Sequence, residues 1–336
     1  MPDGARAIDV HTHIMPPDWE DFAARFGIAG WPWVQKHSAC SAAIMLGDRE
    51  FRRVTDQCFA PVRRIADMDQ DRIARQLLSP IPVLFCYWGS AEATAAFAQR
   101  QNDFIAETVS AHPHRFIAAG TVAMQSPRLA IRELERMSGM GFKAVEIGTN
   151  VAGRYPDDPG VVEVLQAASD LGIAVLIHPW DAIAEDQHRD YYLPHMVLLP
   201  AETALAIARL IFGGVLERLP HLRIAFAHGG GNFIPLLRRI DHGFRVRREA
   251  RAVIDRPPSA YLRRLYFDSI THDTELLELL CKRVGSDRVM LGSDYPFDMG
   301  VQDPVGVLGE TTLSEADRQN ILHRTAEEFL GLEPAR

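Results

Sequence analysis

Gly160–His178, with the sequence GVVEVLQAASDLGIAVLIH, contains a helix, a turn and a strand in succession. The helical period of its apolar residues predicts a helix over Gly160–Leu171, and Leu171-Gly172 is typical of a helix end. The run Ile173–Ile177 is apolar without interruption, as in a strand buried on both faces. This combination indicates a parallel sheet covered by helices, and His178 closes the strand.

The same alternation of a short apolar run and a longer helical pattern continues through most of the 336 residues. The predicted strands are Ala7–His11, Gln76–Pro82, Phe116–Val122, Ala144–Gly148, Ala174–His178, Arg223–His228, Leu265–Ser269 and Val289–Asp294. The predicted helices include Ala91–Ala111, Pro127–Met137, Gly160–Leu171, Ala201–Arg218, Thr274–Arg283 and Ser314–Leu330. This repetition favours an α/β fold, a (β/α)₈ TIM barrel. A doubly wound open sheet would normally have a glycine-rich turn after its first strand, and here that turn is HTHIMPP.

Residues 14–60 interrupt the alternation between the first predicted strand and the first predicted helix. They are rich in aromatic residues, among them Trp19, Trp31 and Trp33. A long segment between two elements of a compact domain is usually functional. We therefore expect a single barrel domain over residues 1–336, with residues 14–60 as an insertion that covers the barrel mouth.

Composition and charge limit the classes of partner. The chain is 47% hydrophobic and 24% charged, as in a soluble globular protein, and its formal net charge is -8. This negative charge argues against nucleic acid and against an anionic membrane surface as partners. No apolar stretch reaches the ~20 residues of a membrane span, and the N-terminus lacks the pattern of a signal peptide. We therefore expect a cytoplasmic location.

His11 and His13 lie at the end of the first predicted strand, in the sequence IDVHTH. Strand side chains alternate between two faces, so these two imidazoles point the same way. His178 and Asp294 close two further predicted strands. Active sites of (β/α)₈ barrels lie at the carboxyl ends of the strands, where these four side chains can meet. Three imidazoles and a carboxylate suit Zn²⁺, and Co²⁺, Mn²⁺ or Fe²⁺ also accept such donors.

His228 closes the sixth predicted strand, in the sequence IAFAHGGG. A metal ion can lower the pKa of its bound water to about 7, and a neutral histidine with a pKa near 6.5 is matched to take that proton. We therefore expect His228 to be a general base. Many two-metal barrels carry a carbamylated lysine at the end of strand 4, but here Lys143 opens that strand and is expected on the surface. One metal ion is expected.

Several motifs extend this pattern beyond the histidines. In the first half they are Ile8–Ile14, Arg25-Phe26-Gly27, His37-Ser38, Phe51-Arg52, Arg64–Asp69, Gln76–Ser79 and Pro82–Trp88. The second half adds Arg115-Phe116, His178–Asp181, Leu199–Thr203, Ala227–Gly231, Arg239-Ile240 and Gly292–Phe297. With these motifs the sequence resembles the decarboxylating branch of the amidohydrolase superfamily, and within it the 2-amino-3-carboxymuconate 6-semialdehyde decarboxylase family. The resemblance covers nearly the whole chain.

The resemblance implies a metal-dependent carbon–carbon lyase that needs no organic cofactor. Its Zn²⁺ ligands and general base would be His11, His13, His178, Asp294 and His228. The implied reaction is non-oxidative decarboxylation of 2-amino-3-carboxymuconate 6-semialdehyde or a closely related unsaturated carboxylate. A zinc-bound hydroxide, formed with His228 as general base, would act on the substrate.

The resemblance also implies how an anionic substrate is held. Arg52 and Arg239 would bind its carboxylates and take part in catalysis, and Phe297 would line the pocket. Family tryptophans near the pocket are replaced here by Tyr192 and His195, so Tyr192 is expected at the substrate and the exact substrate stays open. The family enzyme is a homodimer in which the equivalent of Arg239 enters the neighbouring site. On the helix after the sixth strand, Arg239 would lie on the order of 16 Å from its own site, which agrees with such a donation.

Other functions are compatible with the same residues. A metal-dependent hydrolase of a lactone, ester or amide could use the same hydroxide, but its reaction would release no CO₂. A decarboxylase of an aromatic acid is a nearer alternative. A non-catalytic binding protein on a barrel scaffold would be indicated by failure to bind a divalent metal.

Overall fold

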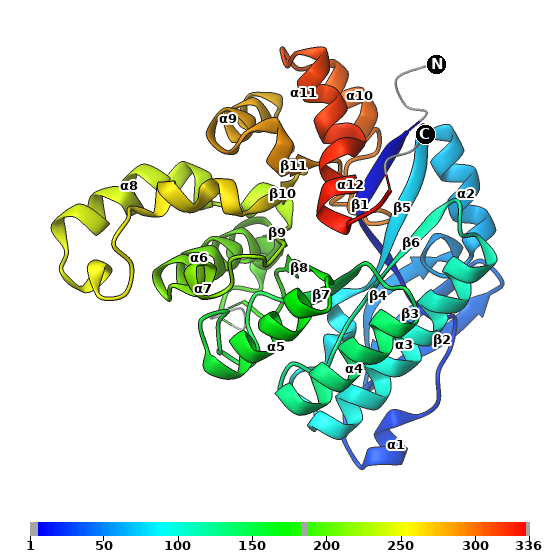
Figure 1. Cartoon of the computed structure of the whole chain (residues 1–336). Coiled ribbons are helices and arrows are strands. Elements are labelled where there is room, and N and C mark those ends of the chain that lie inside the picture. The colour runs from blue at the N-terminus through cyan, green and yellow to red at the C-terminus, as the bar shows by residue number, and fades with distance from the viewer. Residues whose placement is uncertain (1–5, 183–186, 334–336) are drawn as a thin grey trace.

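The chain folds into an eight-stranded parallel barrel surrounded by helices (Figure 1). The computed structural model describes residues 6–182 and 187–333. In sheet order the strands are β1 (Ala7–Ile14), β5 (Ile73–Pro80), β6 (Phe116–Gly120), β7 (Ala144–Gly148), β8 (Ala174–His178), β9 (Ile224–Phe226), β10 (Tyr266–Asp268) and β11 (Val289–Met290). The predicted (β/α)₈ fold is confirmed, and the open doubly wound sheet is excluded.

Backbone contacts between the first and last strands bring the two edges of the sheet together. The Val10 N–H donates to the Leu291 carbonyl at 2.9 Å. Further along, Thr12 forms a parallel bridge with Tyr295, which lies beyond the end of β11. The loop after β11 therefore continues alongside β1, and this places Asp294 beside the histidines of that strand.

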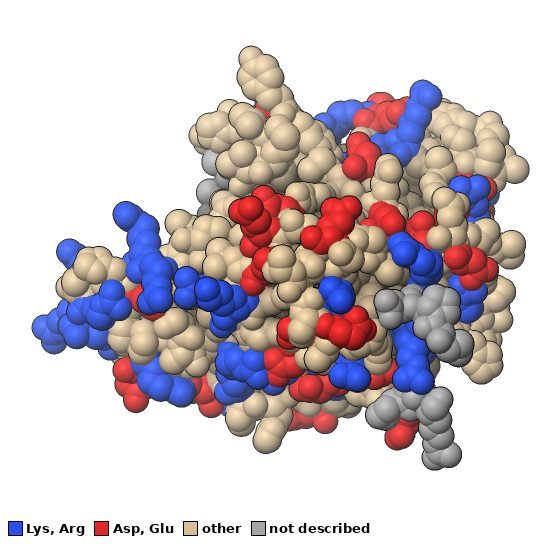
Figure 2. Space-filling model, turned by 90° about the horizontal axis from the view of Figure 1, so that it is seen from above, with Lys and Arg blue, Asp and Glu red and all other residues tan. Residues whose placement is uncertain are grey.

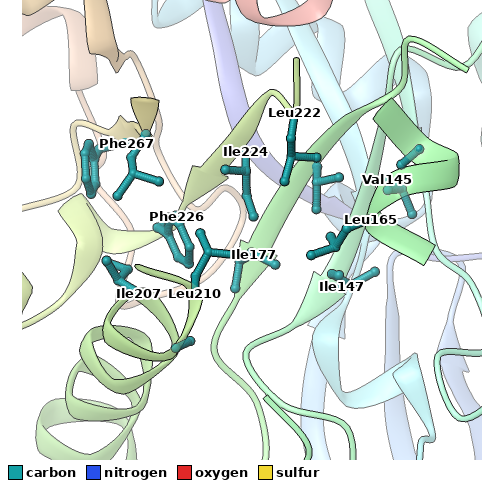
Figure 3. Close-up of a cluster of buried hydrophobic side chains, with 14 of the residues drawn as sticks. Val145, Ile147, Leu165, Ile177, Ile207, Leu210, Leu222, Ile224, Phe226 and Phe267 are labelled. Carbon is teal, nitrogen blue, oxygen red and sulfur yellow. The ribbon is translucent and has the colours of Figure 1, made fainter. Parts of the chain in front are cut away.

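Successive side chains of β7 and β8 point alternately to an outer core and to the inside of the barrel. Val145, Ile147 and Ile177 pack with the surrounding helices in the large outer cluster (Figure 3). Ala144 and Leu176, one residue out of phase, belong to the cluster inside the barrel. The side chains at alternate positions, such as Ala144 and Leu176, therefore point to the barrel axis, as the two-residue period of a strand requires.

Helices cover the outside of the barrel. They are α2 (Pro61–Gln70), α3 (Ala91–Ala111), α4 (Pro127–Gly139), α5 (Pro159–Asp170), α6 (Leu199–Phe212), α7 (Val215–Arg218), α8 (Phe233–Val246), α9 (Thr274–Val284), α10 (Pro304–Gly309), α11 (Glu315–Gln319) and α12 (Thr325–Leu330). The prediction of a single helix over Ala201–Arg218 is wrong. It is divided at Gly213-Gly214, where Gly214 has a φ of 66°. The helix predicted over Ser314–Leu330 contains a π-helical segment, Asn320–Arg324.

The segment after β1 forms a small separate sheet. It consists of α1 (Phe22–Phe26) and three antiparallel strands, β2 (Pro32–Ser38), β3 (Ser41–Leu46) and β4 (Arg49–Thr55). Its apolar face has a core of its own, in which Phe22 and Trp31 pack on Phe97 of α3. The sheet is therefore fixed to the barrel and presents β4 to the carboxyl end of β8, where Phe51 contacts Trp180.

One helical stretch, Asp190–Phe212, is long and apolar enough to cross a membrane by length and composition alone. The sequence reading found no stretch of this kind. Within the stretch, 44% of the most apolar window is buried inside the protein. The buried residues of α6, including Ile207 and Leu210, belong to the outer core of the barrel. The apolar character of α6 is therefore explained by its packing on the strands.

Candidate metal centre and active site

His11 and His13 project from β1 to one point inside the barrel mouth. Their Nε2 atoms lie 3.3 Å apart. The Nδ1 of His11 is 2.6 Å from an oxygen of Asp268, and the Nδ1 of His13 is 2.9 Å from the Pro80 carbonyl. Each ring is thus held through Nδ1, which directs Nε2 to the shared point. This is how protein metal sites usually orient histidine ligands.

His178, Asp294 and His228 reach the same point from different elements. His178 is the last residue of β8, as predicted. Asp294 and His228 do not close strands, contrary to the prediction, because β11 ends at Met290 and β9 ends at Phe226. Both have left-handed backbones, with φ of 60° at Asp294 and 56° at His228. The turns after the two strands, rather than the strands themselves, aim these side chains.

The Asp294 carboxylate lies among the imidazoles. One of its oxygens is 3.0 Å from Nε2 of His13 and 3.6 Å from Nε2 of His11. Its other oxygen is 3.6 Å from Nε2 of His228. The ring of His178 is 5.1 Å from those of His11 and His13, measured between centroids. The structure therefore brings together all four expected ligands and the expected base.

The pKa shifts of His178 and Asp294 favour the protonation states that bind a cation. Burial lowers the pKa of His178, and the neighbouring histidines lower it further, so it lies well below the ordinary value. Burial raises the pKa of Asp294, but interactions with His13 and His228 outweigh burial and hold it well below the ordinary value. A neutral imidazole and an ionised carboxylate are the forms that bind a divalent metal.

Unpaired atoms in the cluster also fit a metal ion. The Nε2 of His178 and one oxygen of Asp294 are buried without a hydrogen-bond partner among the described residues. The ligand atoms of His11, His178, His228 and Asp294 lie within 4.8 Å of one another. Buried polar atoms are nearly always paired, so two atoms with unpaired lone pairs at one point fit the binding of a cation there. The cluster is a metal-binding site.

A cavity of about 460 Å³ opens from the cluster to the surface. His13, His178, His228 and Asp294 face it, and most of its remaining wall is apolar. The other lining residues include Phe51, Ile81, Trp180, Met196, Leu199, Phe297 and Met299. Such a cavity is large enough for a small organic acid.

Arg52 of β4, one of the two arginines expected to bind the substrate, lines this cavity. Its guanidinium carbon lies 4.7 Å from the ring centre of Phe297, which also lines the cavity as predicted. One guanidinium nitrogen donates to the Tyr192 hydroxyl at 2.8 Å. The Tyr192 ring stacks on His195, with 4.2 Å between ring centres, and His195 lines the cavity. Tyr192 therefore contacts two residues that line the cavity, Arg52 and His195. Its contact with the substrate stays a prediction.

Arg239 lies apart from the cavity that its own chain forms. It is exposed on α8, in a surface groove with Leu236, Phe244 and Arg247. In Figure 1 this helix extends away from the barrel at the left, and Figure 2 shows Lys and Arg gathered on that side. Arg239 does not act in its own site as the chain is folded here. Its delivery to a neighbouring subunit stays a prediction.

Three residues that were not predicted to belong to the site support it. Asp268, at the end of β10, holds His11 and accepts the backbone N–H of His228 at 2.8 Å. Arg64 is fully buried and donates to the His13 carbonyl at 2.7 Å. Glu146 of β7 is fully buried, and burial raises its pKa to about 7. Asp268 and Glu146 could have been found as acidic residues within apolar strands.

Lys143 lies outside the site. It precedes β7, at the amino-terminal end of the strand, and is half-buried rather than on the open surface. A bridging carbamylated lysine from this residue is therefore excluded by its position.

Comparisons with known proteins place the chain in a family. The sequence profile of the family described as Amidohydrolase matches residues 8–332. The 2-amino-3-carboxymuconate-6-semialdehyde decarboxylase of Dictyostelium discoideum is 41% identical over 331 residues, which cover 97% of this chain and 92% of that protein. The expected family and enzyme class, a carboxy-lyase, are confirmed at this level of identity.

Solved structures agree with the fold. The apo IDCase of Metarhizium anisopliae superposes with a TM-score of 0.85 at 22% identity, covering 100% of both chains. The 5-carboxyvanillate decarboxylase of Novosphingobium aromaticivorans, complexed with manganese and 4-hydroxy-3-methoxy-5-nitrobenzoic acid, has a TM-score of 0.80 at 25% identity. That match covers 98% of this chain and 97% of the other. This chain belongs to the amidohydrolase family, in the group that contains the 2-amino-3-carboxymuconate-6-semialdehyde decarboxylases.

Proposed function

We propose that this chain decarboxylates 2-amino-3-carboxymuconate 6-semialdehyde, or a closely related unsaturated carboxylate, in a metal-dependent and non-oxidative reaction. The observation that carries the proposal is the convergence of His11, His13, His178 and Asp294 at a cavity that is also lined by an arginine, Arg52. The 41% identity to the Dictyostelium discoideum decarboxylase, over nearly the whole of both chains, supports the choice of substrate.

His11, His13, His178 and Asp294 would hold one divalent ion. Three imidazoles and a carboxylate are donors that Zn²⁺ accepts, and Co²⁺, Mn²⁺ or Fe²⁺ could take its place. When bound, such an ion acts as a Lewis acid and lowers the pKa of a coordinated water to about 7. The reaction then requires no organic cofactor.

His228 would move the proton that the reaction needs. Its Nε2 lies 3.6 Å from an Asp294 oxygen, and its side chain is 22% exposed on the cavity wall. Burial lowers the pKa of His228, but the Asp294 carboxylate outweighs burial and raises it above the ordinary value. With a divalent ion bound beside it, the His228 imidazole would favour its neutral form and could accept a proton from water as a general base. The carbon that loses CO₂ must in turn receive a proton.

Arg52 would orient the substrate through a carboxylate. Its guanidinium is fixed between Tyr192, Asp298 and the face of Phe297. A fork of this kind binds a carboxylate through two parallel hydrogen bonds. Holding the scissile bond in one orientation contributes directly to the rate.

A second copy of the chain would complete the site. Arg239 is exposed on an extended helix and cannot meet the substrate held by its own barrel. We propose a homodimer in which each subunit provides Arg239 to the other, so that the small anionic substrate lies between Arg52 and this second cation. The net charge of -8 makes such local positive charge necessary for an anionic substrate.

The test is release of CO₂ from 2-amino-3-carboxymuconate 6-semialdehyde by metal-replete protein, followed together with the loss of the substrate's near-UV absorbance. We expect both signals to require the metal. Metal-dependent hydrolysis of a lactone, an ester or an amide, with no CO₂ released from this substrate, would indicate a hydrolase instead.

An aromatic acid is the second candidate substrate. The similarity to a 5-carboxyvanillate decarboxylase, whose structure contains a nitrobenzoic acid, favours it. The apolar and aromatic cavity wall, with Phe51, Trp180 and Phe297, is compatible with a planar ring. A panel of hydroxybenzoic acids in the same CO₂ assay distinguishes the two, because only the true substrate reaches a high kcat/KM.

A further inference from the structure

Glu146 lies on the face of β7 that points into the barrel. It is in phase with Ala144, which packs inside the barrel, and out of phase with Val145 and Ile147 of the outer core (Figure 3). In the strand register Glu146 pairs with Leu176, and Gly148 pairs with His178. The Glu146 side chain therefore lies one layer below His178, under the metal centre.

Among the described residues, the histidines His13 and His228 favour the ionised form of this carboxylate, but no Lys or Arg is paired with it. Glu146 has an exposed fraction of 0%, and neither of its oxygens has a hydrogen-bond partner among the described residues. The hydroxyl of Ser79, which lies near it, donates instead to the Thr12 carbonyl at 3.0 Å. Burying an ionised carboxylate without a partner is strongly unfavourable, so its presence here requires a cation or a bound proton.

The metal centre supplies the place for a cation. One Glu146 oxygen and the ligand nitrogens of His11, His13 and His178 all lie within 4.8 Å of one another. A second group within the same limit contains Asp294 and shares two of these histidines. β7 and β11 are fourth and eighth in the order of the barrel strands, so Glu146 and Asp294 approach from opposite sides.

We propose that Glu146 is a further ligand of the metal ion, completing a set with His11, His13, His178 and Asp294. This inference rests on the proposed function, because it takes the cluster to hold a catalytic metal. Four protein ligands would be typical of Zn²⁺, whereas a fifth favours ions that accept more donors, such as Mn²⁺ or Fe²⁺. With Glu146 as a ligand, the site is predicted to favour Mn²⁺ or Fe²⁺ over Zn²⁺ more strongly than it would without Glu146.

The experiment compares metal affinity in wild type and Glu146→Gln, which keeps the shape and removes the charge. Mn²⁺ binding is followed by the electron paramagnetic resonance signal of free Mn²⁺, and Zn²⁺ binding by competition with a chelator. We expect Glu146→Gln to weaken Mn²⁺ binding by at least about tenfold, with a smaller loss for Zn²⁺. The matched control is Glu133→Gln, a buried glutamate that pairs with Arg136 on α4, which should leave both affinities unchanged.

Thermal melting provides a readout that is independent of activity. The substitution removes an unpaired buried charge, so metal-free Glu146→Gln should melt at or above the temperature of metal-free wild type. The increase in melting temperature caused by saturating Mn²⁺ should be smaller in the variant, because a ligand stabilises the fold according to its affinity. A purely structural defect would lower the melting temperature of the metal-free form instead.

Two outcomes would overturn the inference. One is an unchanged Mn²⁺ affinity and spectrum in Glu146→Gln, which would make Glu146 a protonated acid. The other outcome does not depend on the variant and remains available if the variant fails to fold. It is a crystal structure of Mn²⁺-loaded wild type in which no Glu146 oxygen lies within about 2.6 Å of the ion, the upper limit for a metal–oxygen bond. If wild type binds no divalent ion, the proposed function itself fails.

Discussion

His228 is the residue whose role is most open to a direct test, because it belongs to a group of potential ligands and is also the expected base. Replacing it by alanine should lower CO₂ release by about 10²–10⁴-fold, the usual contribution of a general base. Bound metal, measured by atomic emission, should stay at one equivalent. Loss of the metal together with activity would show that His228 is a ligand.

Asp268 acts through another residue. Its carboxylate is 2.6 Å from Nδ1 of His11 and accepts the backbone N–H groups of His228 and Gly229, both at 2.8 Å. Asp268→Asn should weaken metal binding by about 10–100-fold, since such partners fix a ligand's orientation and tautomer. The exposed Asp255→Asn is the control, and chelator competition measures both variants. Equal affinities in the two variants would exclude this positioning role.

At the scale of elements, the turn after β9 depends on Gly231. Its φ is 57°, and a Cβ built there would lie 2.2 Å from the carbonyl oxygen of Pro200 at the start of α6. Gly231→Ala should therefore destabilise the protein by more than about 1 kcal/mol and displace His228. Gly139→Ala, at the exposed end of α4 with no atom near its Cβ, should be neutral or stabilising by about 0.5–1 kcal/mol. Melting curves that rank the two variants the other way would contradict this account of the turn.

The sequence predicts some elements fully and others only in part. β7 and β8 were predicted with their observed ends, because both strands are buried along their whole length and are mostly apolar, although Glu146 interrupts the apolar run of β7. The strands before His228 and Asp294 were predicted too long, since apolar residues continue into turns whose left-handed backbones depend on tertiary contacts. The paired strands β2–β4 were not predicted, because their pairing is set by packing on α3.

The metal residues could be predicted because the barrel brings strand ends together whatever their separation in sequence. Glu146 was missed although it stands in the same apolar run as the rejected Lys143. The period of two assigns Glu146 to the inner face, but only the observed register with β8 shows how close it comes to His178. Asp268 could be suspected from its place in an apolar strand, but its contacts with His11 and His228 are visible only in the folded structure.

At the scale of the whole molecule, the proposed exchange of Arg239 predicts complementation. Arg239→Ala and His228→Ala should each be nearly inactive alone. When the two are unfolded, mixed and refolded together, half of the dimers combine both subunits, and each of these has one intact site. About a quarter of wild-type activity should therefore return, as the symmetry of a two-fold dimer requires. Mixtures no more active than the separate variants would contradict a shared site.

The central claim is that His11, His13, His178 and Asp294 at the barrel mouth bind a divalent ion on which decarboxylation depends. The most direct measurement is CO₂ release from 2-amino-3-carboxymuconate 6-semialdehyde by metal-stripped protein titrated with Zn²⁺ or Mn²⁺. The account predicts negligible release at first and a linear rise that ends at one equivalent of metal per chain. Full release from the stripped protein, with no response to added metal, would contradict it.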